Sequence, residues 1–315
     1  MAEIDIAVPS HNCGPWIDFF FESVVAQDYL DWRIVARDDA STDDTAEHLA
    51  AWKSRLGVRM TILEDSTPRN LGMVGNYNAV LSATSAPWVM FADPDDVWRP
   101  GKLSLTVRSM KEAESAARAR TPVLVCTDAE VVNHLLEPLA SSYWQWSRMN
   151  PELADVLHRM AVESPVLAPM VNRALLDLAM PLIGAASCAD WWSGLVASAF
   201  GRIVRLPERT FLYRRHPSND SLDPFGSTWA GAIRRFLATP GEPRRRVERL
   251  LRQFAPQAAA FVGRFRERLR PEDIAALETA ARLPDLAWFA RRWAVSRHGL
   301  WFGSQSKNIA LLALL

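Results

Sequence analysis

The sequence has few cysteines, and Cys13, Cys126 and Cys188 lie far apart. An odd number at such spacing matches neither a zinc-binding pattern nor a disulfide framework, which favours a reducing, cytoplasmic setting. An excess of charge of one sign is also missing, because 36 Lys and Arg balance 36 Asp and Glu. No global attraction to nucleic acid is indicated, and we expect no nucleic-acid partner.

Long hydrophobic runs are missing as well. No apolar stretch approaches the roughly 20 residues that span a bilayer, and the first residues lack the basic and apolar segments of a signal peptide. We therefore expect a soluble protein or one that lies on a membrane surface. With 315 residues, 49% of them hydrophobic, the chain is long enough to bury a substantial core.

Short apolar runs alternate with segments of helical spacing in the first half. The runs expected to form strands are 4–8, 32–36, 58–63, 88–92 and 123–127. This alternation predicts an α/β fold with a mostly parallel sheet, covered by helices on both faces in three layers. It weakens after about residue 140, and from residue 227 the sequence becomes helical and rich in Arg, Ala and Leu.

Polar clusters follow three of these strands. They are Ser10-His11-Asn12, Asp38-Asp39 and Asp93-Pro94-Asp95-Asp96. The carboxyl ends of parallel strands meet in one crevice, where ligands bind. Packed carboxylates call for a cation, and oxygen ligands together with substrate phosphates suit Mg²⁺ or Mn²⁺. A carboxylate at a strand end also accepts the ring N–H of uracil or thymine. In each case a turn or a helix cap is the structural alternative.

Five motifs in order carry a resemblance. They are Ile6 to Asn12, Ser23 to Tyr29, Asp38 to Asp43, Asn70-Leu71-Gly72 with Asn76-Tyr77-Asn78, and Met90 to Trp98. Over about residues 4–220 the chain resembles a family 2 glycosyltransferase with the GT-A fold. Cys188-Ala189-Asp190-Trp191-Trp192 makes it most similar to bacterial rhamnosyltransferase-like members. Ala189 stands where those relatives carry His, and Ala40 stands where they carry Gly.

The resemblance implies a role for each matching residue. Pro9, Ser10 and Asn12 lie beside the nucleoside, Asp39 accepts the base N–H, and Asn70 contacts the donor. Asp93 lies near the ribose and the metal, Asp95 ligates the metal, and Asp96 supports the loop. The expected ligands of Mn²⁺ or Mg²⁺ are Asp93, Asp95 and His216.

Asp190 is the candidate general base. Inverting sugar transfer needs a carboxylate for the acceptor proton and a cation for the leaving diphosphate. The alternative is a helix N-cap, and a helix start is expected to favour the ionised form. Trp191 and Trp192 are either an acceptor-binding platform or core residues.

Two domains are expected, a GT-A domain over residues 1–222 and a helical extension over 223–315. The extension mixes aromatic and basic residues in Trp288 to Trp293. This leaves open a solvated surface, a peripheral contact with the inner face of the cell membrane, or a homodimer contact. The resemblance implies transfer of a sugar from a dTDP-rhamnose-like or UDP-hexose donor to a glycan or lipid-linked acceptor in bacterial surface polysaccharide assembly. A non-catalytic nucleotide- or glycan-binding relative is the alternative.

Overall fold

A computed structural model describes residues 2–64, 69–149, 157, 161–162, 164, 166–216 and 242–301. The chain divides into two compact units. The sheet unit contains the residues up to Ser142, Val166–Gly184 and Cys188–His216, and the helical unit contains the rest. The expected domain boundary after residue 222 lies outside the described residues, so it stays a prediction.

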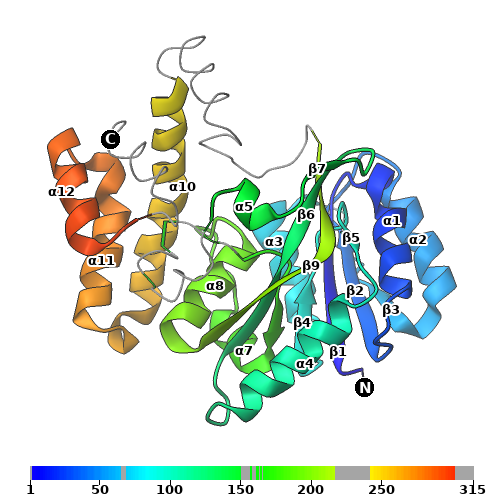
Figure 1. The fold of residues 1–315 in the computed structure, drawn as a ribbon. Helices are drawn as coiled ribbons and strands as arrows, with labels where there is room; N and C mark the ends of the chain where they lie inside the picture. The colour runs from blue at the N-terminus through cyan, green and yellow to red at the C-terminus, as the bar shows by residue number, and fades with distance from the viewer. Residues whose placement is uncertain are drawn as a thin grey trace. The chain divides into compact units, whose positions relative to one another are not determined.

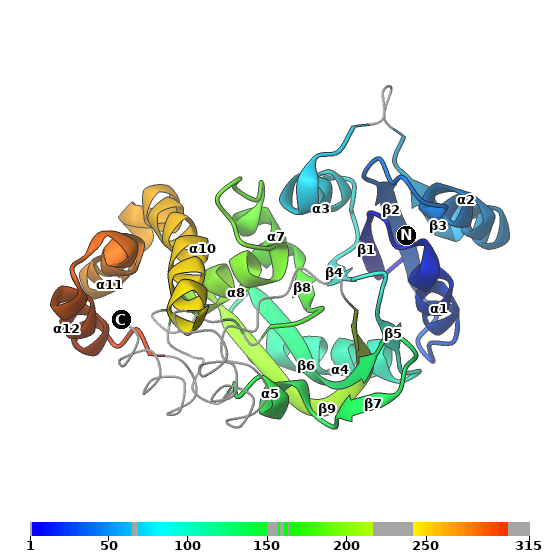
Figure 2. The same cartoon turned by 90° about the horizontal axis from the view of Figure 1, so that it is seen from above.

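The first half of the sheet unit alternates strands and helices (Figure 1). The elements are β1 (Ile4–Ser10), α1 (Gly14–Val25), β2 (Trp32–Asp38), α2 (Thr45–Leu56), β3 (Met60–Ile62), α3 (Gly72–Ser82), β4 (Trp88–Phe91) and α4 (Lys102–Ser115). The pairs β1–β2, β1–β4 and β2–β3 are all parallel. Helices α1 and α2 lie on one face of these strands and α3 lies on the other (Figure 2). The predicted α/β alternation is confirmed here.

The second half of the sheet unit is less regular. Its elements are β5 (Val97–Trp98), β6 (Val123–Asn133), β7 (Pro138–Ala140), β8 (Met170–Asn172), α7 (Arg173–Ala179), α8 (Ala189–Phe200) and β9 (Arg202–Arg215). The strand order is β3-β2-β1-β4-β8-β6-β9-β5, with β7 paired to β6. Strand β8 runs antiparallel to β4 and β6. The sheet is therefore mixed. The regular alternation predicts the parallel strands β3, β2, β1 and β4, whereas the parallel pair β6–β9 lies outside it.

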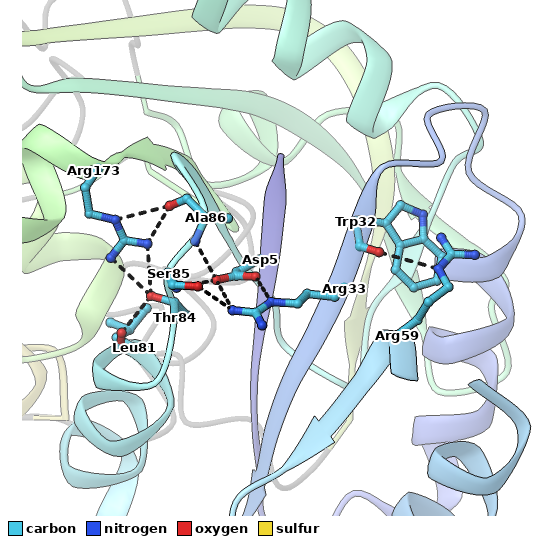
Figure 3. A network of polar contacts seen from close by, with 9 residues as sticks. All are labelled: Asp5, Trp32, Arg33, Arg59, Leu81, Thr84, Ser85, Ala86 and Arg173. Carbon is cyan, nitrogen blue, oxygen red and sulfur yellow. Dashed lines mark hydrogen bonds and ion pairs between the residues drawn. The ribbon is translucent and has the colours of Figure 1, made fainter. Parts of the chain in front are cut away.

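Strand β1 carries a charged residue into the core near its amino end. Asp5 is fully buried and pairs with Arg33 of β2, with 2.5 Å between Asp5 Oδ1 and Arg33 Nε (Figure 3). The backbone N–H of Ala86 donates to Asp5 Oδ2 at 2.9 Å. Burial by itself raises the pKa of Asp5, but the hydrogen bonds from Arg33 and Ala86 outweigh it and the pKa lies below its usual value. The charge ties β1, β2 and the segment before β4 together.

The helical unit contains α5 (Tyr143–Trp146), α10 (Glu242–Phe265), α11 (Pro271–Arg282) and α12 (Trp288–His298). Apolar side chains such as Phe254, Phe261 and Leu277 are buried in it. The helical character expected of the C-terminal part is confirmed. None of the helices in the described ranges combines the length and apolar character that crossing a membrane requires.

Candidate active site

The loop after β1 is held by the loop after β2. Asn12 Oδ1 accepts from the Thr42 N–H at 2.8 Å, and the Asn12 N–H donates to Ser41 Oγ at 2.9 Å. Ser10 is buried, Pro9 is partly buried and Asn12 is exposed. Ala40 has φ 55°, the left-handed region that favours glycine. Pro9 and Ser10 thus end β1, and Asn12 follows them in the loop. Ala40 lies in the loop after β2, at a backbone conformation that suits Gly.

Asp39 lies in a buried polar network at the same edge. Asp39 Oδ1 accepts from Arg37 Nη1 at 2.5 Å and from the Leu71 N–H at 2.8 Å. Arg37 and Asp39 are 1% and 2% exposed. Asn70, by contrast, is exposed, and its Oδ1 accepts from the Gly72 N–H at 2.9 Å where α3 begins. Arg37 was not among the predicted site residues. The only sequence signal for it is a charged residue at the end of an apolar strand.

The carboxylates after β4 occupy different surroundings. Asp93 Oδ1 accepts from the Tyr77 hydroxyl at 3.0 Å. Burial, with Asp95 as the second cause, raises the pKa of Asp93 to about 6. Asp96 is buried and accepts from the Arg214 N–H at 3.1 Å, and burial together with Asp95 and Asp93 raises its pKa well above the usual range. The loop therefore concentrates negative charge that its own residues only partly neutralise.

His216 meets this loop from the end of β9. Its Nε2 lies 3.0 Å from Asp95 Oδ2, 121 positions away in the sequence. The imidazole stacks on Trp16, with ring centroids 5.2 Å apart. Arg214 is buried, donates from Nε to the Asp95 carbonyl at 2.7 Å, and lies 5.0 Å from the Trp16 ring centroid. Trp16 was not assigned to the site from its sequence context.

The donor set suits a hard divalent cation. A carboxylate oxygen and an imidazole nitrogen from Asp95 and His216 converge, and diphosphate oxygens and water ordinarily complete such a site. Within the described ranges, no group of three His, Cys, Asp or Glu side chains is placed to hold a metal. The structure thus brings together two of the three predicted ligands, and Asp93 as the third stays a prediction.

Asp190 lies in the first turn of α8, and the N-cap of this helix is Cys188. Asp190 Oδ2 accepts from the Ala168 N–H at 3.0 Å. Burial, with Asp93 as the second cause, raises the pKa of Asp190 well above the usual range. The pKa of Asp190 is therefore raised, whereas the helix start was expected to favour the ionised form.

A buried lysine lies beneath these carboxylates. Lys102 is fully buried, and its Nζ lies 3.4 Å from the Ala168 carbonyl oxygen and 4.4 Å from the Phe211 ring centroid. Burial lowers its pKa to about 8, whereas Asp96 and Asp190 act in the opposite direction. Ala168 thus contacts both Lys102 and Asp190. Sequence reasoning missed Lys102, since nothing local distinguishes it from a surface lysine at a helix start.

The two tryptophans after Asp190 face inward. Trp192 is fully buried and its Nε1 donates to the Ala179 carbonyl at 3.0 Å. Trp191 is 8% exposed. A platform for an acceptor sugar needs accessible ring surface, so Trp192 is a core residue here, and the expectation that it binds the acceptor is not supported. Trp191 stays a candidate.

Comparisons with known proteins show what the chain is similar to. Residues 5–148 match the model of Glycosyl transferase family 2. An uncharacterized glycosyltransferase of Nostoc sp. is 24% identical over 72% of this chain and 69% of its own length. The UDP-Glc:alpha-D-GlcNAc-diphosphoundecaprenol beta-1,3-glucosyltransferase WfgD of Escherichia coli is 28% identical over 34% of this chain, and the match spans only 40% of that relative.

Solved structures confirm the fold. S. aureus TarS 1-349 in complex with UDP-GlcNAc has a TM-score of 0.54 and 16% identity, over 95% of this chain and 93% of TarS. The mannosyltransferase PcManGT from Pyrobaculum calidifontis, in complex with GDP-Man and Mn²⁺, has a TM-score of 0.52 and 16% identity. The match covers 99% of this chain and 86% of PcManGT. Both are GT-A glycosyltransferases, so the predicted GT-A fold is confirmed. Residues 5–148 are therefore similar to a glycosyl transferase family 2 domain, and the chain has the GT-A fold.

Proposed function

We propose that the protein is an inverting, metal-dependent glycosyltransferase. It moves a sugar from a nucleoside-diphosphate donor, dTDP-rhamnose-like or UDP-hexose, to a hydroxyl of a glycan or lipid-linked acceptor in bacterial surface polysaccharide assembly. The observation that carries the proposal is the approach of Asp95 to His216 within 3.0 Å, beside a loop rich in carboxylates. The names of the relatives support it, since one uses UDP-Glc with a diphosphoundecaprenol-linked sugar and a structural neighbour holds GDP-Man with Mn²⁺.

Asp95 and His216, with Asp93, would hold Mn²⁺ or Mg²⁺. When bound, the ion would neutralise the diphosphate that leaves the sugar. The loops with Pro9, Ser10, Asn12 and Asn70 would orient the nucleoside and diphosphate.

Asp190 would act as the general base. The Ala168 N–H fixes Oδ2 at 3.0 Å and so leaves Oδ1 for the acceptor hydroxyl. A carboxylate whose pKa is raised is a stronger base in its ionised form, which suits proton removal from a sugar hydroxyl. In an inverting displacement the acceptor oxygen attacks the anomeric carbon while the bond to the diphosphate breaks. The proton passes to Asp190.

Asp190→Asn tests the assignment. The side-chain oxygen of Asn keeps the Ala168 hydrogen bond, so the variant should fold, but the amide takes no proton. We expect kcat to fall by roughly 10²–10⁴-fold, with donor affinity unchanged by calorimetry. Asp177→Asn, on the exposed face of α7, is the matched control. Full activity in Asp190→Asn would contradict the role, and donor binding without any turnover in the wild type would favour the non-catalytic alternative.

The helical unit suits a membrane-surface contact. On α12, Phe289 and Trp293 are 79% and 64% exposed, and Arg292 and Arg297 lie over Trp288 and Trp293 at 4.6 Å and 5.5 Å. Aromatic rings among arginines fit an anionic lipid surface, in keeping with a cytoplasmic protein on the inner face of the membrane and a lipid-linked acceptor.

Sedimentation with vesicles of phosphatidylcholine and phosphatidylglycerol tests this contact. We expect Trp293→Ser to lose vesicle binding. Val58→Ser, which removes an exposed apolar side chain from the sheet unit, should keep it. A change of oligomeric state without a change in vesicle binding would instead assign the face to a homodimer.

A further inference from the structure

Asp39, the carboxylate expected to bind the nucleobase, already accepts hydrogen bonds from other groups of the protein. Asp39 Oδ1 accepts from Arg37 Nη1 at 2.5 Å and from the Leu71 N–H at 2.8 Å. A carboxylate oxygen has two lone pairs, so these two donors satisfy Oδ1. Among the described residues no hydrogen bond involves Oδ2. Asp39 therefore has one oxygen, and not two, to offer to a ligand.

Arg37 also donates hydrogen bonds to two further groups. Its Nη1 also donates to Asn76 Oδ1 at 2.8 Å, and its Nη2 donates to the Arg69 carbonyl at 3.0 Å. Asn76 in turn donates to the Ser10 carbonyl at 3.2 Å. The network joins the carboxyl ends of β1 and β2 to the segment before α3, so Asp39 keeps one orientation with Oδ2 as its remaining acceptor.

We propose, on the basis of the proposed function, that the Arg37–Asp39 pair makes the donor site selective for uracil or thymine over guanine. Uracil and thymine present one ring N–H, for which one carboxylate oxygen suffices. Guanine presents two adjacent donors, the ring N–H and the exocyclic amino group, which need both oxygens. With Oδ1 engaged, the second guanine donor lacks an acceptor. An unmatched buried donor should weaken binding roughly tenfold or more.

The fold alone does not decide the base, since one structural neighbour holds UDP-GlcNAc and another holds GDP-Man. The discrimination therefore comes from this chain's own side chains. Arg37 acts as a positioning residue, because it determines how many acceptors Asp39 presents.

Asp39→Asn tests the proposal, because a pair with a purely structural role would not change the nucleotide preference when it is substituted. Arg37 and the Leu71 N–H are both donors, so they fix the amide with its oxygen at the Oδ1 position. The NH₂ group then occupies the Oδ2 position. It opposes the ring N–H of uracil but matches the ring nitrogen of cytosine, which is an acceptor. We expect the preference to change from UDP over CDP to CDP over UDP.

The experiment is calorimetric titration of the full chain with UDP, dTDP, CDP and GDP in the presence of Mn²⁺. The matched control is Asp5→Asn, the same substitution in the buried Asp5–Arg33 pair near the amino end of β1 (Figure 3). This control should lose stability but keep the wild-type order of nucleotides. If Asp39→Asn does not fold, Arg37→Lys is the second variant, because Lys keeps the charge but lacks the forked donors of the guanidinium group. We expect it to reduce the ratio between the affinities for UDP and GDP.

We expect the wild type to bind UDP and dTDP roughly tenfold or more tighter than GDP. Equal or tighter binding of GDP, or an unchanged order in Asp39→Asn, overturns the base selectivity and leaves the proposed sugar transfer standing. Failure of every nucleoside diphosphate to bind overturns both.

Discussion

Asp93→Asn should stabilise the cation-free protein at neutral pH while it impairs transfer. The pKa of Asp93 is raised from 3.8 to about 6 by burial and by Asp95. A carboxyl group whose pKa is higher in the folded state binds more protons there than in the unfolded state between these two values. Stability therefore falls as pH rises through this window. About two pKa units at 1.36 kcal/mol each give up to about 3 kcal/mol.

The substitution keeps the local geometry. The amide oxygen of Asn accepts from the Tyr77 hydroxyl as Asp93 Oδ1 does at 3.0 Å, but it carries no charge toward Asp95. Urea unfolding with EDTA, at pH values from 4.5 to 7.5, measures the free energy of unfolding of both proteins. The advantage of the variant should be small at pH 4.5 and grow toward the full value at pH 7.5.

Added Mn²⁺ should stabilise the wild type more than the variant, because a ligand that binds only the folded state raises its stability. Asp177→Asn, exposed on α7, should change stability by no more than about 0.5 kcal/mol at any of these pH values. A variant that is no more stable than the wild type at pH 7.5, or an advantage that does not depend on pH, would refute the reasoning.

Three further predictions follow from single residues. Ala40→Gly should raise the free energy of unfolding by up to about 1 kcal/mol in urea titrations, because Ala40 has φ 55°. Asp5→Asn should make stability less sensitive to acid: the pKa of Asp5 is lowered, so its contribution is complete above pH 3.8 and is lost as pH falls through the folded value. Lys102→Met removes a buried positive charge near Asp190, so the acid limb of the kcat–pH profile should move to higher pH.

The local features of the sequence predicted the parallel pairing of β1, β2 and β4. Strands β1, β2 and β4 are buried apolar runs separated by helices, and polar residues follow each of them. Parallel pairing then places these residues at one edge. Strand β8 has only three residues and pairs antiparallel between β4 and β6. Such a short strand carries no periodicity, so its direction is decided by tertiary pairing.

The contacts of the site were less predictable, because they join distant segments. His216 meets Asp95 across 121 positions, and only the resemblance to known glycosyltransferases drew attention to the pair. Arg37 and Lys102 look like ordinary strand-end and helix-start residues until burial is known. Trp192 shows the opposite case, since an aromatic residue beside a candidate base is in fact packed in the core.

The charges at this site explain why stability and activity should oppose each other. Three buried or nearly buried cations, Arg37, Lys102 and Arg214, lie among five carboxylates: Asp39, Asp93, Asp95, Asp96 and Asp190. Each of these cations also contacts a backbone carbonyl. These cations hold loops in place, and they do not neutralise the negative charge of every carboxylate. The raised pKa values of Asp93, Asp96 and Asp190 are the consequence. A protein selected for stability alone would replace such residues, so their presence together supports the proposed binding of a cation.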